Sequence, residues 1–452
     1  MNDSKINQFS TKISKLCELL FPIHRCITGN GTRETLKILK NNIDLTLHEI
    51  PTGTKVFDWQ IPQEWNISNA YILNENNKKI VDYKKSNLHV LQYSVPIDKK
   101  LSLDELKKHL FTNSKHPDLI PYVTSYYSKN WGFCLSYNEF LKLKDETYHV
   151  IIDSKLKDGS LTYGELLIEG KIKNEILIST YVCHPSLYND NLSGIVLTTL
   201  LAEYFLKNKP YYSIRFLFIP ETIGSIAWLS INEKKLDNIE HGLVATCVGD
   251  SGVFTYKKTR DGDNTIDHVV EDVLINSKKP FKILDFWPSG SDERQYCSPG
   301  FNLPVGSLMR TPYENFEEYH TSGDNLNLMN PKNLVESLLL YISIINKLEN
   351  YPDESTLKKQ KRKKKTSKFN DHVFLNLFPK CEPYLNKRGL YNSINQSKNL
   401  EKMKTQKTIQ WILNLSDSTN SINDIAKISK INSSFLLEIS EILLKQKLLL
   451  KL

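Results

Sequence analysis

The sequence predicts an α/β protein in which helices sandwich a mixed, mostly parallel sheet, with a β-rich insertion and a C-terminal winged helix-turn-helix domain. Three observations predict this class. Strand-like and helix-like segments alternate between about residues 145 and 350, and an aromatic stretch with short strand-like runs precedes them. Three helical segments follow a run of lysines near the C-terminus.

We expect the main domain to comprise residues 1–56 and 141–352. Its first part contains two helical patterns, INQFSTKISKLCELLF and RETLKILKNNI, separated by the helix-breaking sequence TGNG. Its second part alternates strands such as NEILISTYV and SIRFLFIP with helices such as LSGIVLTTLLAEYFLKN. Strands that are joined by helices favour parallel neighbours in one sheet.

The remaining segments differ from the main domain in amino-acid composition. Residues 57–140 are rich in tryptophan and tyrosine and contain strand-like runs such as NLHVLQYSVPI, which predicts an inserted β-rich subdomain. Residues 353–369 are a basic linker, and residues 370–452 form the winged helix domain. In that domain Ser421 and Asn432 are expected to cap two helices with helix-turn-helix proportions, and the ending KLLLKL is expected to form a strand of the wing.

Composition limits the class of protein. The hydrophobic content of 40% and charged content of 24% are ordinary for a globular protein, and no apolar run of 18 residues predicts a membrane span. The seven cysteines are scattered without a CxxC pair, so we expect reduced thiols and a cytoplasmic location. The net charge of +8 comes largely from KKQKRKKK, which is either a solvated linker or a contact with nucleic acid or another anionic surface.

Polar residues of metal-binding type follow four strand-like segments. His184 and Asp190 follow NEILISTYV, and Glu221 follows SIRFLFIP. Asp250 ends GLVATCVGD, and His320 lies beyond NLPVGSLM in the loop before the last helix. Ligands of open α/β sheets bind at the carboxyl ends of strands, and zinc takes imidazole and carboxylate ligands. The sequence therefore predicts a divalent metal site at this edge of the sheet.

Each residue also has an interpretation without a metal. A loop histidine need not be a ligand, Asp190 and Glu221 could cap the helices that follow them, and Asp250 could be a turn residue. Their recurrence at four strand ends favours a common site.

The motifs around these residues resemble those of the co-catalytic zinc aminopeptidases and their carboxypeptidase relatives. CHPSLYNDNLSG resembles the metal-binding loop, PETIG the E-E-x-G motif, VGD the strand-end aspartate, and EEYHTSGDN the late Y-H-T-x-x-D motif. The resemblance implies that His184, Asp190, Asp250 and His320 bind zinc, with Asp190 as the bridging ligand. It also implies that Glu221 is the general base.

A bacterial group of aminopeptidase-like proteins with a C-terminal winged helix is more similar still. HRCITGNGTRETL, PTGTKVFDWQIPQEWNI and IPYVTSYYSKNWGFCL resemble its signatures, and the resemblance covers nearly the whole chain. One departure concerns the metal: Thr222 replaces the second glutamate of E-E-x-G, and a threonine hydroxyl is a poor zinc ligand. We therefore expect one zinc site, made by His184, Asp190 and Asp250, and a second site that is weak or absent.

The function implied is that of a zinc-dependent hydrolase acting on a peptide or small amide, as an aminopeptidase-like exopeptidase. Zinc lowers the pKa of its bound water and polarises a carbonyl oxygen. Glu221 would take the proton of that water and hand it to the leaving amine. Tyr319 is the candidate hydrogen-bond donor to the oxyanion.

Substrate contacts are less defined. Asp292, Glu317 and Glu318 are the candidates for holding a free amine. Arg25 either reaches an anionic substrate group or is a surface or capping arginine. A further set would either line the cleft or simply pack: Thr124, Tyr126 and Trp131.

Two other functions remain open. The first is a zinc-dependent amidase, deacylase or cyclase acting on a modified sugar or small metabolite, since the related glutaminyl cyclases use one zinc. The second is a winged-helix regulator whose α/β domain senses a ligand. IAKISKINSSFLLEIS offers few arginines to bind base edges, so we expect a protein partner or a homo-oligomer rather than nucleic acid at this domain.

Overall fold

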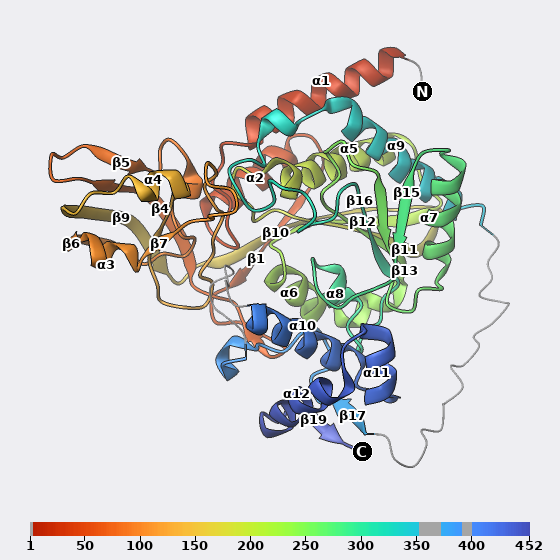
Figure 1. The fold of residues 1–452 in the computed structure, drawn as a ribbon. Helices are drawn as coiled ribbons and strands as arrows, with labels where there is room; N and C mark the ends of the chain where they lie inside the picture. Colours follow the sequence, from red (N-terminus) through yellow and green to blue (C-terminus); the bar gives the residue numbers. More distant parts are fainter. Residues whose placement is uncertain (1–2, 352–371, 391–399) are drawn as a thin grey trace.

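The computed structural model describes residues 3–351, 372–390 and 400–452, and its centre is an eight-stranded mixed sheet (Figure 1). Four of the seven neighbouring strand pairs are parallel, in agreement with the predicted class. The strands, in spatial order, are β1 (Thr46–Pro51), β10 (Ser160–Ile168), β12 (Tyr212–Ile219), β11 (Ile172–Tyr181), β13 (Ile239–Ala245), β16 (Val305–Met309), β14 (Phe254–Lys257) and β15 (Phe281–Leu284).

Helices cover both faces of this sheet (Figure 1). Alternate residues of β11 separate the two cores: Ile178 packs in the cluster that contains α5, and Leu177 packs in the cluster that contains α6. The first face carries α1 (Asp3–Leu20), α2 (Asn30–Lys40), α5 (Ser193–Lys207), α7 (Thr265–Asn276) and α9 (Pro331–Leu348). The second face carries α6 (Ile223–Asn232) and the short α8 (Glu293–Tyr296).

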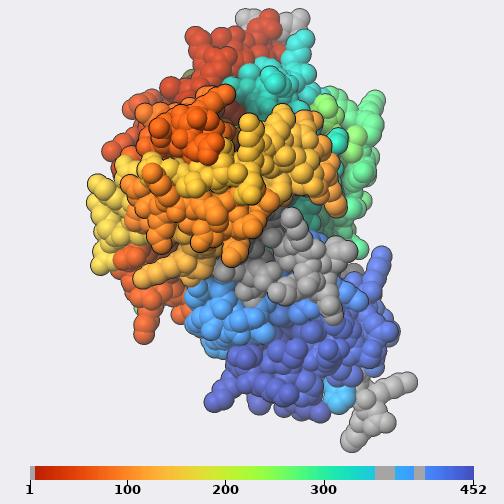
Figure 2. Space-filling view, turned by 60° about the vertical axis from the view of Figure 1, so that its left-hand side comes forward, coloured from red at the N-terminus to blue at the C-terminus, as the bar shows by residue number. Residues whose placement is uncertain are grey.

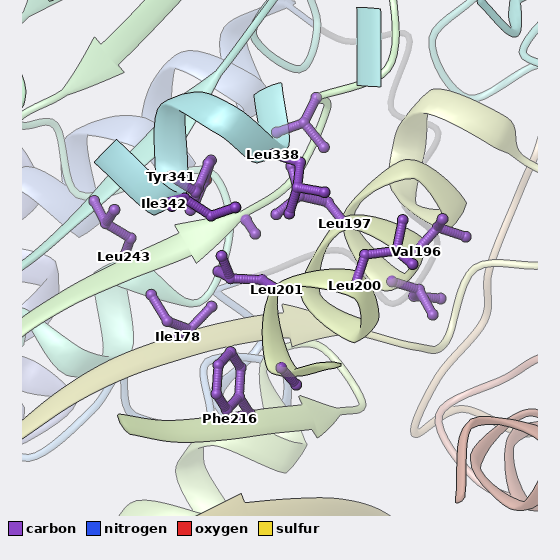
Figure 3. Packing of buried hydrophobic residues seen from close by; sticks show 14 of the residues in the cluster. Ile178, Val196, Leu197, Leu200, Leu201, Phe216, Leu243, Leu338, Tyr341 and Ile342 are labelled. Carbon is purple, nitrogen blue, oxygen red and sulfur yellow. The ribbon is translucent and has the colours of Figure 1, made fainter. Parts of the chain in front are cut away.

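The α5 helix is the centre of the first core. Leu197 and Leu201 lie among Ile178 of β11, Phe216 of β12 and Tyr341 of α9 (Figure 3). All five side chains are fully buried, which accounts for the nearly continuous apolar sequence of this helix.

The insertion forms a four-stranded antiparallel sheet that projects from the main domain (Figure 1). Its strands are β5 (Lys79–Asp82), β4 (Glu64–Leu73), β9 (Thr147–Lys157) and β6 (Ile97–Ser102). Smaller elements accompany it: β2 (Lys55–Val56), β3 (Trp59–Gln60), α3 (Leu103–Lys107), β7 (Leu110–Phe111), β8 (Phe133–Cys134) and α4 (Tyr137–Leu141).

The position of β9 corrects the expected boundary at residue 141. We expected this strand in the main sheet, but it pairs with β4 and β6. The reason is visible in its burial pattern: Tyr148, Val150 and Ile152 are buried and alternate with more exposed residues. That alternation suits an antiparallel sheet with one solvated face, whereas the central strands of the main sheet are buried on both faces.

The C-terminal domain has the expected winged helix elements. They are β17 (Val373–Asn376), α10 (Leu400–Leu415), β18 (Asp417–Ser421), α11 (Ile422–Ser429), α12 (Ser433–Lys445) and β19 (Leu449–Lys451). Ser421 and Asn432 accept hydrogen bonds from the first turns of α11 and α12, so both predicted caps are confirmed. The predicted basic linker, residues 353–369, lies outside the described residues.

The C-terminal domain lies on the side of the main sheet that carries α6 and α8, and it also contacts the insertion (Figures 1 and 2). The carboxylate of Asp58 forms ion pairs with Lys387 and Arg388, and the ring of Trp59 lies 4.6 Å from that of Tyr384. Within the described ranges no helix combines the length and the apolar character that crossing a bilayer requires.

The packing of α5 leads to a stability prediction. Leu201→Ala is expected to destabilise the protein by about 2–5 kcal/mol, because it removes buried methyl groups from a close-packed core. Leu206→Ala, on the same helix but 47% exposed, should change stability by less than about 0.5 kcal/mol. Chemical denaturation followed by circular dichroism measures both; equal effects would contradict the packing of α5 between the sheet and α9.

Candidate metal and active site

The loop between β11 and α5 carries the first two predicted ligands. His184 is 6% exposed and Asp190 is 1% exposed, and the peptide bond between Asp190 and Asn191 is cis. The carboxylate of Asp324 holds this loop, because it accepts hydrogen bonds from the backbone N–H groups of Asn189 and Asp190 at 2.6 and 2.9 Å. Sequence analysis did not single out Asp324, although it is the aspartate of the YHTSGD sequence.

The glycine that ends the same loop motif has a steric role. A Cβ on Gly194 would lie 2.4 Å from the carbonyl oxygen of Ala245, at the end of β13. Asn191 anchors the loop from the other side, since its amide donates to Thr180 Oγ1 at 2.9 Å. The Asn-Leu-Ser-Gly sequence therefore lets α5 begin directly against the sheet edge.

His320 comes from the loop between β16 and α9, and the insertion holds it in place. Its backbone is left-handed, with φ of 53°, and its carbonyl accepts a hydrogen bond from the N–H of Tyr122 at 2.7 Å. The Tyr122 ring lies 5.1 Å from the His184 ring and 5.0 Å from the His320 ring. A strained backbone that surrounding contacts fix in this way is common at functional sites.

Three of the four predicted ligands converge. Asp190 Oδ2 lies 3.0 Å from His320 Nε2 and 3.8 Å from His184 Nε2. One ligand atom from each residue can be chosen so that all three lie within 4.8 Å of one another. They come from two loops at the carboxyl edge of the sheet, as the strand-end argument predicted.

Neighbouring groups set the charge of this cluster. Although burial opposes ionisation, the two histidines and the hydroxyl of Tyr181, which donates to Asp190 Oδ1, hold the pKa of Asp190 at about 2. Burial lowers the pKa of His184 to about 4, so its imidazole is neutral at physiological pH. A buried carboxylate beside neutral imidazole is the protonation state that a metal ligand set requires.

Two further observations fit a zinc ion. His320 Nε2 is buried and has no well-aligned hydrogen bond to any described residue. His184 Nδ1 contacts the thiol of Cys183 at 3.4 Å, which leaves His184 Nε2 for a ligand role. Cys183 also belongs to a second group that could hold a metal ion, with His184 and Glu221, and burial raises the pKa of its thiol well above its usual range.

Glu221 lies beside this cluster. Its Oε2 is 4.0 Å from His184 Nε2, and its side chain is 26% exposed and lines the cavity described below. Burial, and then the carboxylates of Asp292 and Asp190, raise the pKa of Glu221 well above its usual range. The next residue, Thr222, accepts a hydrogen bond from Arg294 Nη2 at 2.8 Å.

The expectation that Asp250 is a ligand is not met. Its carboxylate accepts hydrogen bonds from the backbone N–H groups of Gly252 and Thr311, at 3.1 and 3.4 Å, and lies outside the ligand cluster. The physical reason is the turn after β13, where the chain passes through a positive φ at Cys247 and carries Asp250 beyond the site. Thr246 lies at the strand end instead, and its hydroxyl contacts that of Tyr181 at 2.7 Å.

Two substrate-binding candidates are also corrected. Asp292 is fully buried behind Thr222, where Oδ1 accepts hydrogen bonds from Thr222 N and Ser225 Oγ, and burial raises its pKa to about 7. Arg25 is fully buried and donates from Nε to the carbonyl of His184 at 2.9 Å. Neither side chain lines the cavity, so Arg25 is a support of the metal loop rather than a surface or anion-binding residue.

A cavity of about 970 Å³ opens over the cluster. All three parts of the chain line it: Tyr319 of the main domain, Thr124 and Tyr126 of the insertion, and Gln410 of the C-terminal domain are examples. Tyr319 stacks on His320 with ring centroids 3.9 Å apart.

Two other residues predicted to contact the substrate lie at the edge of this cavity or outside it. Glu317 is at the mouth with 80% of its side chain exposed, and Trp131 stacks on His109 away from the cavity.

Comparisons with known proteins agree with this architecture. Residues 14–351 match the family described as Domain of unknown function (DUF4910), and residues 372–451 match a winged helix-turn-helix family. A Clostridium acetobutylicum protein called "Putative polysaccharide biosynthesis protein with aminopeptidase-like domain" is 51% identical, over 92% of this chain and 90% of its own length.

Solved structures show the same fold. A crystal structure described as a "putative peptidase" from Clostridium acetobutylicum has a TM-score of 0.75 at 47% identity, and covers 100% of this chain and 99% of its own. A zinc aminopeptidase from Bacillus subtilis has a TM-score of 0.57 at 12% identity, with 76% of this chain and 95% of its own covered. A peptidase M28 precursor from Shewanella amazonensis reaches 0.52 at 13% identity with the same coverage.

The chain therefore belongs to the family described as Domain of unknown function (DUF4910), and it combines a zinc-aminopeptidase-like fold with a C-terminal winged helix domain.

Proposed function

We propose that the protein is a zinc-dependent hydrolase of the aminopeptidase type, which cleaves an amide bond in a peptide or small amide. The convergence of two imidazoles and one carboxylate next to Glu221, inside a cavity of ligand size, carries this proposal. The comparisons support a peptidase-type enzyme, since the relatives that share about half of the sequence are called aminopeptidase-like and peptidase.

His184, Asp190 and His320 would hold a single zinc ion, as the three protein ligands of a catalytic site with an open fourth position. When bound, this ion would acidify water and polarise the substrate carbonyl. The change in the predicted ligand set also affects the number of zinc ions expected per chain. A second group of three possible ligands, Cys183, His184 and Glu221, shares His184 with the first, so we expect the two groups to hold one zinc ion per chain rather than two.

The chain's own residues would move the proton and hold the charge. A bound cation would favour the ionised form of Glu221, whose Oε2 would then accept a proton from the attacking water and deliver it to the leaving nitrogen. The hydroxyl of Tyr319 would donate to the developing oxyanion, since the ring is fixed by its stack on His320. Tyr181 would keep Asp190 oriented, because its hydroxyl donates to Oδ1 while Oδ2 faces the histidines.

A second candidate function keeps this site and changes the substrate. A single-zinc amidase or deacylase acting on an N-acyl sugar is favoured by the one-metal ligand set and by the polysaccharide biosynthesis name of the 51% identical relative. Aminoacyl anilides and N-acyl amino sugars, assayed side by side, distinguish the two.

DNA binding by the winged helix domain is disfavoured. The exposed positions of α12, the helix that would enter the major groove, include Glu438 and Glu441, and Lys445 is its one basic residue. Acidic side chains on that face repel phosphates.

We further propose a cytoplasmic location, because all seven cysteines are buried and unpaired.

Metal content tests the ligand set. His320→Ala should lose stoichiometric zinc, because it removes one of three converging ligands. Asp250→Asn should retain it, because that carboxylate bonds to backbone N–H groups outside the cluster. Elemental analysis of the purified proteins measures both, and zinc loss in Asp250→Asn alone would restore the ligand set expected from sequence.

Catalysis tests the role of Glu221. Glu221→Gln should lower kcat by at least about 100-fold while zinc stays bound, because it removes the proton acceptor and retains the shape of the side chain. Glu438→Gln, on the exposed face of α12 and outside the cavity, is the matched control and should stay near wild type. Wild-type turnover in Glu221→Gln would remove the residue from its assigned role.

A further inference from the structure

The C-terminal domain forms part of the wall of the candidate active site. Met403, Gln406, Lys407 and Gln410 of α10 line the same cavity as the metal cluster. Their spacing places them on one stripe of the helix. Ile412, on the opposite side of the helix, and Ile409 and Leu413, which flank the stripe, pack in the core of the domain.

Contacts close to the site hold this wall in place. Glu382, which precedes α10, forms an ion pair with Arg294 at 3.2 Å, and Arg294 also donates to Thr222. The backbone N–H of Glu382 donates to Gln295 Oε1 at 2.9 Å. Lys407 of α10 pairs with Glu314 at 3.4 Å, on the loop that carries His320.

Gln410 is the most buried of the four α10 residues that line the cavity. It is only 9% exposed, yet its amide makes no hydrogen bond with the part of the chain that the structure describes. Asn414, one turn further along α10 and 6% exposed, shows the contrast, because its Oδ1 accepts from Arg260 Nε at 3.0 Å. Because the Gln410 amide lines the cavity and is not a sealed, unsatisfied group, it offers donors and an acceptor to a ligand there.

The charges on this wall are already neutralised. Glu382 is paired with Arg294, and Lys407, which pairs with Glu314, is exposed, so the less exposed groups that this domain presents to the cavity are chiefly the amides of Gln406 and Gln410 and the thioether of Met403. A charged ligand group buried there would lose its hydration without gaining a counter-ion from this wall.

We propose that α10 is the specificity wall of the enzyme, and that Gln410 binds a neutral hydrogen-bonding group of the substrate, a carboxamide or hydroxyl, next to the bond that is cleaved. This proposal rests on the proposed function for the identity of that bond. It assigns to a winged helix domain the recognition of a small substrate in place of DNA.

A kinetic experiment tests the specificity. Gln410→Met keeps the volume of the side chain and removes its hydrogen bonds. With dipeptides whose second residue is Asn, Ser, Leu, Asp or Lys, kcat/KM should fall about tenfold for Asn or Ser and stay within about twofold for Leu. Glu438→Gln, on the exposed face of α12, is the control. Equal losses for all substrates, or no loss for Asn and Ser, overturn the proposal.

A binding experiment separates this proposal from the catalytic one. Glu221→Gln protein, with and without Gln410→Met, is titrated with asparagine amide, N-acetylglucosamine, aspartate and lysine amide by calorimetry. About tenfold weaker binding of a neutral probe in the Gln410→Met protein supports the proposal, and the probe affected tells carboxamide from hydroxyl. If no dipeptide is hydrolysed, the proposed function fails while this result still decides the inference. No binding of either neutral probe, or binding unaffected by Gln410→Met, overturns it.

The variants must be folded for these readouts. Zinc content and the thermal midpoint are compared with wild type. If Gln410→Met is unstable, Gln410→Leu, which also removes the amide, takes its place with the same expected pattern.

Discussion

The burial of the Asp190 carboxylate is the constraint on which the site depends. A carboxylate that is 1% exposed needs compensation for its lost hydration. The protein supplies one hydroxyl, from Tyr181 to Oδ1, and two imidazoles that face Oδ2. These groups orient the carboxylate without neutralising it fully, because His184 is itself uncharged at physiological pH. The arrangement leaves a negative site that a divalent cation completes.

Most of the surrounding structure serves to maintain that burial. Asp324 accepts two backbone N–H groups of the loop that carries Asp190. Gly194 lets α5 approach the end of β13, and Arg25 donates a hydrogen bond to the carbonyl of His184. Tyr122 of the insertion holds the carbonyl of His320. Residues of two domains therefore hold the candidate metal site in place.

Sequence periodicity and strand-end chemistry predicted the sheet, the winged helix and the convergence of His184, Asp190 and His320, because these depend on local pattern and on the topology of parallel strands. They could not place Asp250, whose direction is set by a positive φ at Cys247 that no periodicity encodes. Asp292 was expected to hold a substrate amine, and Arg25 to reach an anionic substrate group or to be a surface or capping residue, yet both are fully buried. Their burial depends on partners distant in sequence, such as the carbonyl of His184 and the hydroxyl of Ser225. The role of α10 was hidden for the same reason, since its amphipathic pattern is that of any helix with one buried side.

The contacts of the C-terminal domain indicate what its winged helix fold contributes to the candidate site. A winged helix offers a small independent core, here that of Phe374, Ile412 and Leu443, and it supports one helix rigidly along its length. In a DNA reader the exposed helix is α12, but in this protein α10 is the helix that faces the ligand cavity, and α12 carries acidic residues. Lys407 of α10 and His116 of the insertion both pair with the loop that carries His320, through Glu314 and Glu317. The hydrogen bond from Tyr122 N to the carbonyl of His320 is the buried contact between the insertion and this loop, so both domains lie against the segment that positions a candidate metal ligand.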